Sequence, residues 1–181
     1  PGVARKANYP FGLGLSYTQF AIDQIRGEEK DGMIRLSACV TNVGERAGKE
    51  VVQVYAQAPQ GKLGKPARTL VSFVKTRLLA PGETQTVFLS FAVDSLASYD
   101  DLGKVAKSAY VCEAGGYRFH LGNSVRDTVE VPFAHTEPAD RVVQQLTQRV
   151  APVALPERML ADGSYEALPV TPGGEKDRNP A

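Results

Sequence analysis

The chain has 181 residues, a length that fits one domain with an appendage or two small domains and excludes a large multidomain enzyme. Its 21 Lys and Arg residues nearly balance 20 Asp and Glu residues, which argues against a nucleic-acid-binding protein with a concentrated basic excess. With 17 Gly, 12 Pro and 43% hydrophobic residues, the composition indicates a globular, turn-rich β protein.

The first residues have no initiator Met, and no apolar stretch follows Arg5 and Lys6, so they do not resemble a signal peptide. We therefore expect the chain to be a segment of a longer protein. No apolar run approaches the roughly 18 residues of a membrane-spanning helix, so we expect no contact with a membrane. These features leave the compartment open, with the cytoplasm preferred over the periplasm or secretion.

Short stretches of alternating apolar and polar residues follow a lead-in over residues 1–15. Turn residues such as Asn42, Gly44 and Pro81 separate these stretches, and no long amphipathic helix interrupts them. The pattern predicts an all-β fold, an antiparallel immunoglobulin-like sandwich over residues 16–134. The predicted strands cover residues 16–25, 33–41, 50–57, 69–79, 84–93, 109–113, 117–121 and 128–133, with a tight turn at Gly115-Gly116.

The two cysteines, Cys39 and Cys112, are too few for a disulfide scaffold or a cysteine-based zinc site. Their wide spacing would allow a bond across the sandwich. However, strand alternation places Ile34, Leu36 and Val40 on the apolar face of their strand and Cys39 on the opposite face. We therefore expect two unpaired thiols.

Composition changes near residue 135, and residues 135–181 are expected to form an extension or linker. Within it, Val142, Val143, Leu146 and Val150 have helical spacing, which predicts one short helix over residues 140–150. The last eleven positions, residues 171–181, are polar and rich in Pro and Gly, as in a linker or an extended arm.

The most informative run is Y-P-F-G-L-G-L-S-Y-T at residues 9–18. It resembles the first segment of the fibronectin type III-like domain in glycoside hydrolase family 3, the family of β-glucosidases and β-xylosidases. Further runs match this domain in order over roughly residues 9–125. They are V-T-N-V-G at residues 40–44, A-G-K-E-V-V-Q-V-Y at 47–55, K-P at 65–66 with L-V-S-F at 70–73, L-A-P-G-E-T at 79–84, and G-Y to L-G-N-S at 116–124.

The resemblance implies a fibronectin type III-like sandwich that serves as a non-catalytic accessory domain. It implies a parent enzyme that hydrolyses β-glycosides, most often β-glucosides, with a (β/α)8 barrel and an α/β sandwich as catalytic domains in the same chain. In the commonest arrangement this accessory domain ends the enzyme. Because almost fifty residues follow the sandwich here, we expect the permuted arrangement, in which the barrel follows it.

The residues that a family 3 glycosidase uses for catalysis are absent from this sequence. The mechanism needs two carboxyl groups, and in the family the nucleophile lies in a Ser-Asp-Trp-like motif. The chain has no Trp, and Asp94, Asp100 and Asp101 are expected to form turns. His120 and His135 lack a third ligand at a suitable spacing, so we expect no metal and no cofactor. The segment alone is predicted to be inactive.

The candidate functional residues are therefore contacts to other domains. Residues Tyr9, Pro10, Phe11, Gly12 and Gly14 are expected to form an interdomain strap. A second candidate is the loop from Gln60 to Pro66, which lies in a region with seven basic residues and one acidic residue, Glu50. Alternatively, these basic residues lie on solvated strand edges and contact no partner. The contact candidates in and beside this loop are Lys62, Leu63, Lys65 and Arg68.

A function from another class is a free-standing, immunoglobulin-like module that binds carbohydrate or protein. Such a module would present an exposed aromatic strip on one sheet. The aromatic residues mostly follow the strand alternation, and core packing is therefore the expectation for most of them. They are Tyr17, Phe20, Tyr55, Phe73, Phe88, Phe91, Tyr117 and Phe119.

Overall fold

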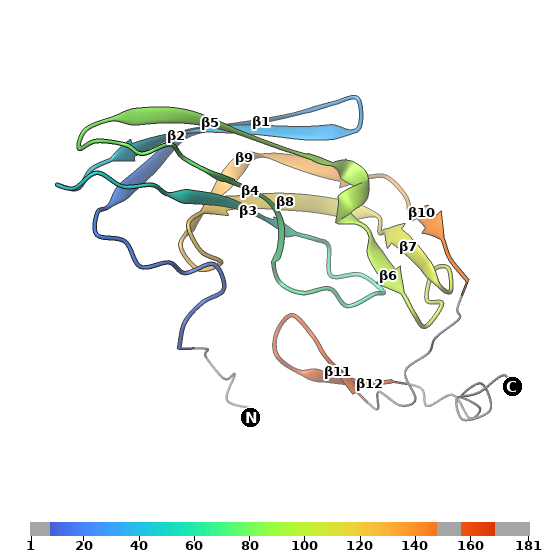
Figure 1. Ribbon diagram of the computed structural model, residues 1–181. Helices are drawn as coiled ribbons and strands as arrows, with labels where there is room; N and C mark the ends of the chain where they lie inside the picture. The colour runs from blue at the N-terminus through green and yellow to red at the C-terminus, as the bar shows by residue number, and fades with distance from the viewer. Residues whose placement is uncertain (1–7, 148–156, 169–181) are drawn as a thin grey trace, which may run out of the picture.

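Antiparallel strands make up nearly all of the regular structure in the computed structural model, which describes residues 8–147 and 157–168 (Figure 1). No helix within these residues is long and apolar enough to cross a membrane. A three-stranded sheet has the order β1-β2-β5 and lies over a four-stranded sheet of order β4-β3-β8-β9. Their bounds are β1 (Phe20–Lys30), β2 (Met33–Asn42), β5 (Thr84–Ala92), β4 (Thr69–Lys75), β3 (Val51–Gln57), β8 (Gly115–Gly122) and β9 (Thr128–Glu137).

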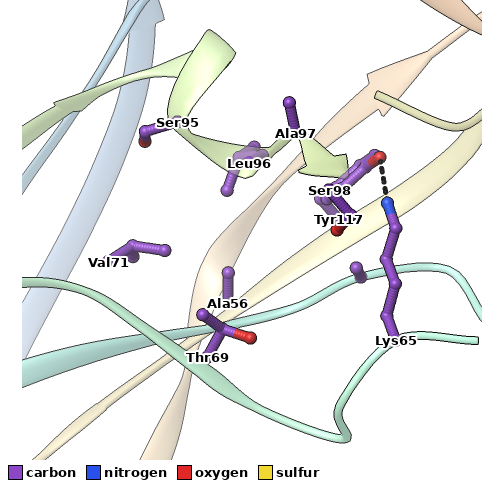
Figure 2. A pocket seen from close by; sticks show the side chains of 10 residues that line it. Ala56, Lys65, Thr69, Val71, Ser95, Leu96, Ala97, Ser98 and Tyr117 are labelled. Carbon is purple, nitrogen blue, oxygen red and sulfur yellow. Dashed lines mark hydrogen bonds between the residues drawn. The ribbon is translucent and has the colours of Figure 1, made fainter. Parts of the chain in front are cut away.

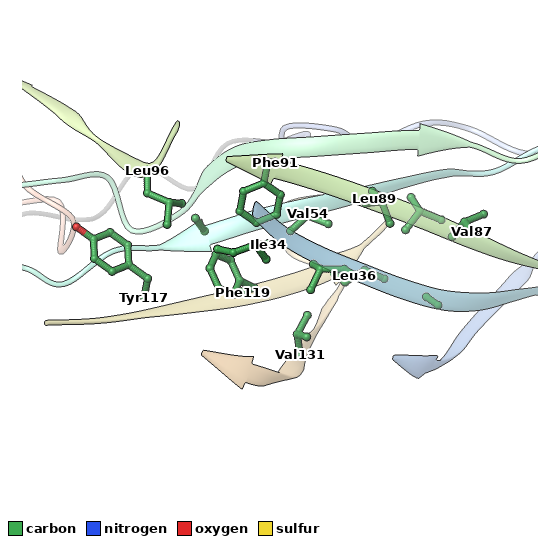
Figure 3. Packing of buried hydrophobic residues seen from close by; sticks show 14 of the residues in the cluster. Ile34, Leu36, Val54, Val87, Leu89, Phe91, Leu96, Tyr117, Phe119 and Val131 are labelled. Carbon is green, nitrogen blue, oxygen red and sulfur yellow. The ribbon is translucent and has the colours of Figure 1, made fainter. Parts of the chain in front are cut away.

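The core lies between these two sheets, as the alternation predicts (Figure 3). In β2 every second residue from Ile34 to Val40 is buried, and Leu36 pairs in register with Leu89 of β5. Phe119 of β8 is fully buried and contacts Phe91 across the core, with ring centroids 5.4 Å apart. The predicted all-β antiparallel sandwich is confirmed.

Strand phase also decides the state of the cysteines. Cys39 lies on the outer face of β2 and Cys112 is buried in the core, and both are unpaired as predicted.

The expectation for the aromatic residues is wrong at three positions. Tyr17 precedes the first strand and is exposed, while Phe73 and Phe88 lie on the outer faces of β4 and β5. Alternation shows that a strand has two faces, but an aromatic residue type does not show which face is buried.

A third sheet at one end of the sandwich corrects two predictions (Figure 1). Residues 141–145, which were expected to be helical, form strand β10, and this strand pairs with β7 (Ala109–Cys112). Positions 148–150 of the predicted helix lie outside the described residues. The adjacent Val142 and Val143 break the strand alternation, and the pairing with β7 accommodates them with a register shift between Val142 and Gln144. The turn predicted at Gly115-Gly116 is instead the start of β8. This sheet consists of β6 (Ser98–Asp100), β7 (Ala109–Cys112) and β10 (Arg141–Gln145), and a 3-10 helix, η1 (Val93–Leu96), leads into it.

The extension continues the ordered structure past residue 134, because β9 runs to Glu137 and β10 joins the third sheet. Further on, β11 (Glu157–Met159) and β12 (Tyr165–Ala167) form a hairpin. Arg158 binds the Glu166 carboxylate and donates a hydrogen bond to the carbonyl of Leu63. Lys104 also pairs with Glu166. The hairpin is therefore bound to the sandwich by charged contacts.

Asp100 organises the loop between β6 and β7 and confirms the prediction that it forms a turn. Its carboxylate is almost fully buried and accepts hydrogen bonds from four successive backbone amides, those of residues 103–106. Burial raises the pKa of this carboxyl, but the four amide bonds outweigh the burial and hold the pKa below its ordinary value of 3.8. The ionised form is therefore the one that the fold stabilises.

Replacing Asp100 with Asn is expected to lower the free energy of unfolding at neutral pH by about 2 kcal/mol, because an amide NH2 cannot accept from Val105 and Ala106. The Asp100 contribution is fully present above pH 3.8 and is lost as pH falls through the lower folded pKa. Urea unfolding as a function of pH measures both effects. The matched control is Asp101→Asn at the exposed neighbouring carboxyl, and equal pH profiles for the two variants would contradict this account.

Candidate functional site

The segment from Asn8 to Gln19 contains the described part of the predicted lead-in, and we call this segment the lead-in from here on. It is bound to the four-stranded sheet through its backbone. Gln53 of β3 donates from its side-chain amide to the carbonyls of Gly12, at 3.0 Å, and Asn123, at 2.7 Å. The Val125 amide donates to the carbonyl of Phe11 at 2.9 Å. One buried glutamine thus joins the lead-in to the loop after β8.

The approach of the lead-in to β3 requires glycine at position 12. Gly12 has a φ of +81°, a conformation that favours glycine. A Cβ atom at this position would lie 2.1 Å from the Gln53 side-chain oxygen and 2.6 Å from the Tyr55 hydroxyl. The runs at residues 9–18 and 47–55, far apart in sequence, therefore belong to one contact.

The other end of the lead-in is fixed by Asn42, which is fully buried and uses both ends of its side chain. Its amide nitrogen donates to the carbonyls of Arg46 and Leu79, each at 2.8 Å. Its oxygen accepts from the Thr18 hydroxyl at 2.7 Å and from the Gly44 amide at 3.1 Å. The run at residues 40–44 was expected to supply a strand-ending turn, and in the structure it also binds the lead-in.

With its backbone bound, the lead-in presents a row of large apolar side chains to solvent. Tyr9 is 79% exposed, Leu15 101% and Tyr17 96%, and Phe11 and Leu13 between them are also exposed. Phe11 rests edge-on against Tyr55 and still leaves most of its ring exposed. We call this row the lead-in stripe (Tyr9, Phe11, Leu13, Leu15 and Tyr17). Five exposed large apolar side chains within nine residues are typical of a surface that contacts a partner.

Replacing Gly12 with Ala is expected to detach the lead-in, because the new Cβ would enter the space of Gln53 and would impose a left-handed backbone on alanine. The amide of Val125 should then exchange with solvent at least about tenfold faster, corresponding to a loss of about 1.4 kcal/mol or more. Gly14→Ala is the matched control, since no atom lies within 4 Å of a Cβ there. Equal exchange in the two variants would show that Gly12 is not needed for the contact.

In the loop from Gln60 to Pro66, Lys65 is neither a contact to another domain nor part of a solvated strand edge. Lys65 is buried, and its ammonium lies 3.7 Å from the Glu113 carboxylate and 3.2 Å from the Tyr117 hydroxyl. Burial lowers the pKa of Lys65, and Glu113 opposes this shift. Glu113 also accepts from the backbone amides of Lys62 and Leu63. Glu113, which the sequence did not single out, fixes this loop.

The other candidates in and beside this loop are divided between the interior and the surface. The Leu63 side chain is buried, and so, like that of Lys65, it is used within the domain. Lys62 is exposed and pairs with Asp140. Arg68 is half-buried and donates to the Val125 carbonyl and the Thr128 hydroxyl. Of the predicted contacts, Lys62 and the lead-in residues remain the most accessible.

Nothing in the described part of the chain resembles a glycosidase active site. A cavity between the sheets has a volume of about 50 Å³ and is lined by Lys65, Tyr117 and small side chains, with no carboxylate (Figure 2). This is well below the roughly 300–1,000 Å³ of ordinary ligand pockets. His120 binds Gln57 and His135 binds Glu29, and among the described residues no cluster of three potential ligands could hold a metal.

Comparison with known proteins agrees with this fold and with the motifs. Residues 50–125 match the family of the fibronectin type III-like domain. The chain therefore contains a fibronectin type III-like domain, as the motifs predicted. This class accounts for the two facing sheets and for the buried residues of β3 and β8.

The particular proteins that this chain resembles are β-glucosidases. It is 48% identical to β-glucosidase A of Butyrivibrio fibrisolvens over 94% of this chain and 22% of the relative. The β-glucosidase structure from Paenibacillus barengoltzii is 44% identical, with a TM-score of 0.76 over 89% of this chain and 19% of that one. β-Glucosidase 3B of Thermotoga neapolitana is 38% identical, with a TM-score of 0.67 over 76% of this chain and 18% of that one. The chain thus spans about a fifth of the length of these proteins.

Proposed function

We propose that this chain is a non-catalytic accessory domain of a family 3 glycoside hydrolase, and that it supports the catalytic domains of that enzyme. The whole enzyme hydrolyses β-glycosidic bonds, most often those of β-glucosides, as the names of its relatives suggest. The partners of the domain are a (β/α)8 barrel and an α/β sandwich in the same chain. The observation that carries this proposal is the lead-in stripe, a series of exposed apolar side chains on a segment that is bound to the sandwich at Phe11 and Gly12 and again at Thr18 and Gln19.

The stripe suits a neighbouring domain better than it suits a freely soluble module. Apolar side chains gain free energy when they leave water, at roughly 25 cal/mol per Å². Leu15 and Tyr17 contribute nothing to the core of this domain, yet they lie between two bound points of the lead-in, Gly12 and Thr18. An interface of this kind fixes the position of one domain on another, and through it the geometry of a distant active site.

The extension supports the permuted domain order as part of this proposal. The relatives from B. fibrisolvens and P. barengoltzii match 94% and 89% of this chain, so both matches must include more than half of residues 138–181. The T. neapolitana protein matches 76%. We propose that the hairpin β11–β12 leads from the sandwich into the barrel domain. Its contacts with Leu63 and Lys104 would fix the direction of the chain there.

The double variant Leu15→Ser and Tyr17→Ser tests the proposed interface in two settings. In the 181-residue chain it should leave the melting temperature unchanged, since both side chains are exposed. In the complete gene product it should lower both the melting temperature and the turnover of a chromogenic β-glucoside. Phe73→Ser, at an exposed aromatic residue on the outer face of β4, is the control. No effect in the complete protein, or β-glucoside turnover by the 181-residue chain alone, would refute the proposal.

A further inference from the structure

The outer face of the third sheet carries a row of side chains that the proposed role does not use. Tyr99 of β6 pairs in register with Tyr110 of β7, which pairs in turn with Gln144 of β10. The two tyrosine rings are 42% and 40% exposed, and their centroids lie 5.6 Å apart. We call this row the Tyr-Tyr-Gln row (Tyr99, Tyr110 and Gln144).

The polar ends of the Tyr-Tyr-Gln row are free within the described part of the chain. Neither tyrosine hydroxyl nor the Gln144 amide has a hydrogen-bond partner among the described residues, although the neighbouring Gln145 binds three backbone carbonyls through its side chain. The opposite face of β7 is apolar and buried, with Ala109 and Val111 inside. The sheet therefore holds the row in place from behind while its polar atoms point to solvent.

A groove opens beside this row. It has a volume of about 370 Å³ and is lined by Tyr110, Gln144 and Val143 together with Asp94, Ser95 and Ala97 of the segment around η1. The groove is shallow and broadly open to solvent, so a ligand would lie along it instead of being enclosed. Asp94 is paired with Arg141 at 2.7 Å and remains mostly exposed, so its carboxylate can still accept hydrogen bonds.

We propose that this groove binds the pyranose rings of a neutral saccharide. An aromatic face covers the apolar C–H face of a sugar ring, and the tyrosine hydroxyl offers a polar group at its edge. Sugar hydroxyls can donate to Asp94 and can both donate to and accept from Gln144. Arg141 is shared between Asp94 and Glu137, so the groove does not offer a free guanidinium to an anionic ligand, and a neutral, hydroxyl-rich ligand suits its hydrogen-bonding groups.

The same chemistry distinguishes a saccharide from a proline-rich peptide, which also binds aromatic grooves. A proline-rich segment offers carbonyl acceptors and few donors. Asp94 already accepts from Arg141 and can accept further hydrogen bonds, and a saccharide supplies several donors on each ring. The site does not depend on the chain being part of a glycosidase, because it rests on the groove and the Tyr-Tyr-Gln row alone.

The experiment is a titration of the ¹⁵N-labelled 181-residue chain with cellotetraose, followed by amide chemical shifts. We expect saturable shifts confined to β6, β7, β10 and the segment around η1. Tyr110→Ala should weaken the affinity by about fivefold to tenfold. Phe88→Ala removes an exposed aromatic residue on the outer face of β5, in another sheet, and should leave the affinity unchanged.

Gln144→Ala provides a second test that does not touch the tyrosine pair, because this exposed side chain has no partner among the described residues. It should also weaken binding while the amide spectrum of the free chain stays that of a folded protein. The proposal is overturned if cellotetraose causes no saturable shifts, or if the shifts lie elsewhere. It is equally overturned if Tyr110→Ala and Phe88→Ala bind alike, or if a proline-rich peptide binds the row and cellotetraose does not.

Discussion

Replacement of Phe119 by Ala is expected to lower the free energy of unfolding by about 3–5 kcal/mol, the largest effect of any single change considered for this domain. Phe119 is fully buried between the two sheets. Its ring contacts Phe91 of the opposing sheet and stacks on Phe133 of the neighbouring strand, with centroids 5.4 Å and 6.1 Å away. Truncation removes these contacts and leaves a cavity that the strands on both sides cannot close. Urea unfolding followed by circular dichroism measures the loss.

Phe88→Ala is the matched control for this prediction, since it removes the same ring from the outer face of β5. Phe88 is 74% exposed, and we expect a change below about 0.5 kcal/mol. Similar losses for Phe119 and Phe88 would contradict the assignment of inner and outer faces. The comparison therefore tests the strand phase and the packing at once.

Replacement of Asn42 by Ala is expected to lower the free energy of unfolding by about 2–4 kcal/mol. The side chain is fully buried and satisfies the carbonyls of Arg46 and Leu79 as well as the amide of Gly44. Alanine would remove the Asn42 partner from all three groups; the Leu79 carbonyl would keep the Gly48 amide, but the carbonyl of Arg46 and the amide of Gly44 would lose the bonds that hold the turn. The lead-in should also loosen, because the Thr18 hydroxyl loses its acceptor. Chemical unfolding measures the first effect, and amide exchange at Val43, which donates to the Gln19 carbonyl, measures the second.

Asn8→Ala is the control at an exposed asparagine of the lead-in and should change the stability by less than about 0.5 kcal/mol. If Asn42→Ala unfolds at the same urea concentration as the unchanged chain, the bonds of Asn42 do not stabilise the fold. If the stability falls but exchange at Val43 is unchanged, Asn42 supports the turn alone and not the lead-in.

The strands of the two main sheets could be predicted from the sequence, because alternation along β2 and β5 directly reflects one buried face and one exposed face. Strand β10 could not, since its adjacent valines do not alternate with polar residues, and the irregular pairing at Val142–Gln144 that accommodates them is not visible in the sequence. Nothing local distinguishes that pattern from one turn and a half of helix. Only its pairing with β7, some thirty residues earlier in the chain, does so.

The candidate site shows the same limit. The glycines of the lead-in could be singled out from the sequence, but the partner of Gly12 is Gln53, forty-one residues away. The burial of Lys65 could not be predicted from the sequence either, because a lysine in a basic stretch is usually solvated. Its burial depends on Glu113, which the fold of β7 and β8 brings to it. Glu113 lies far from this loop in the sequence, so nothing in the loop itself indicates the pair.

Hydroxyl-radical footprinting of the lead-in stripe tests the central claim most directly, because it reports the solvent exposure of individual side chains. In the 181-residue chain Tyr9, Leu15 and Tyr17 should be oxidised readily, and the buried Tyr117 should not. In the complete gene product we predict that oxidation of the stripe falls several-fold while Tyr117 stays protected. Equal oxidation of Leu15 and Tyr17 in the two proteins would contradict the account, since the stripe would then face solvent in the whole enzyme as well.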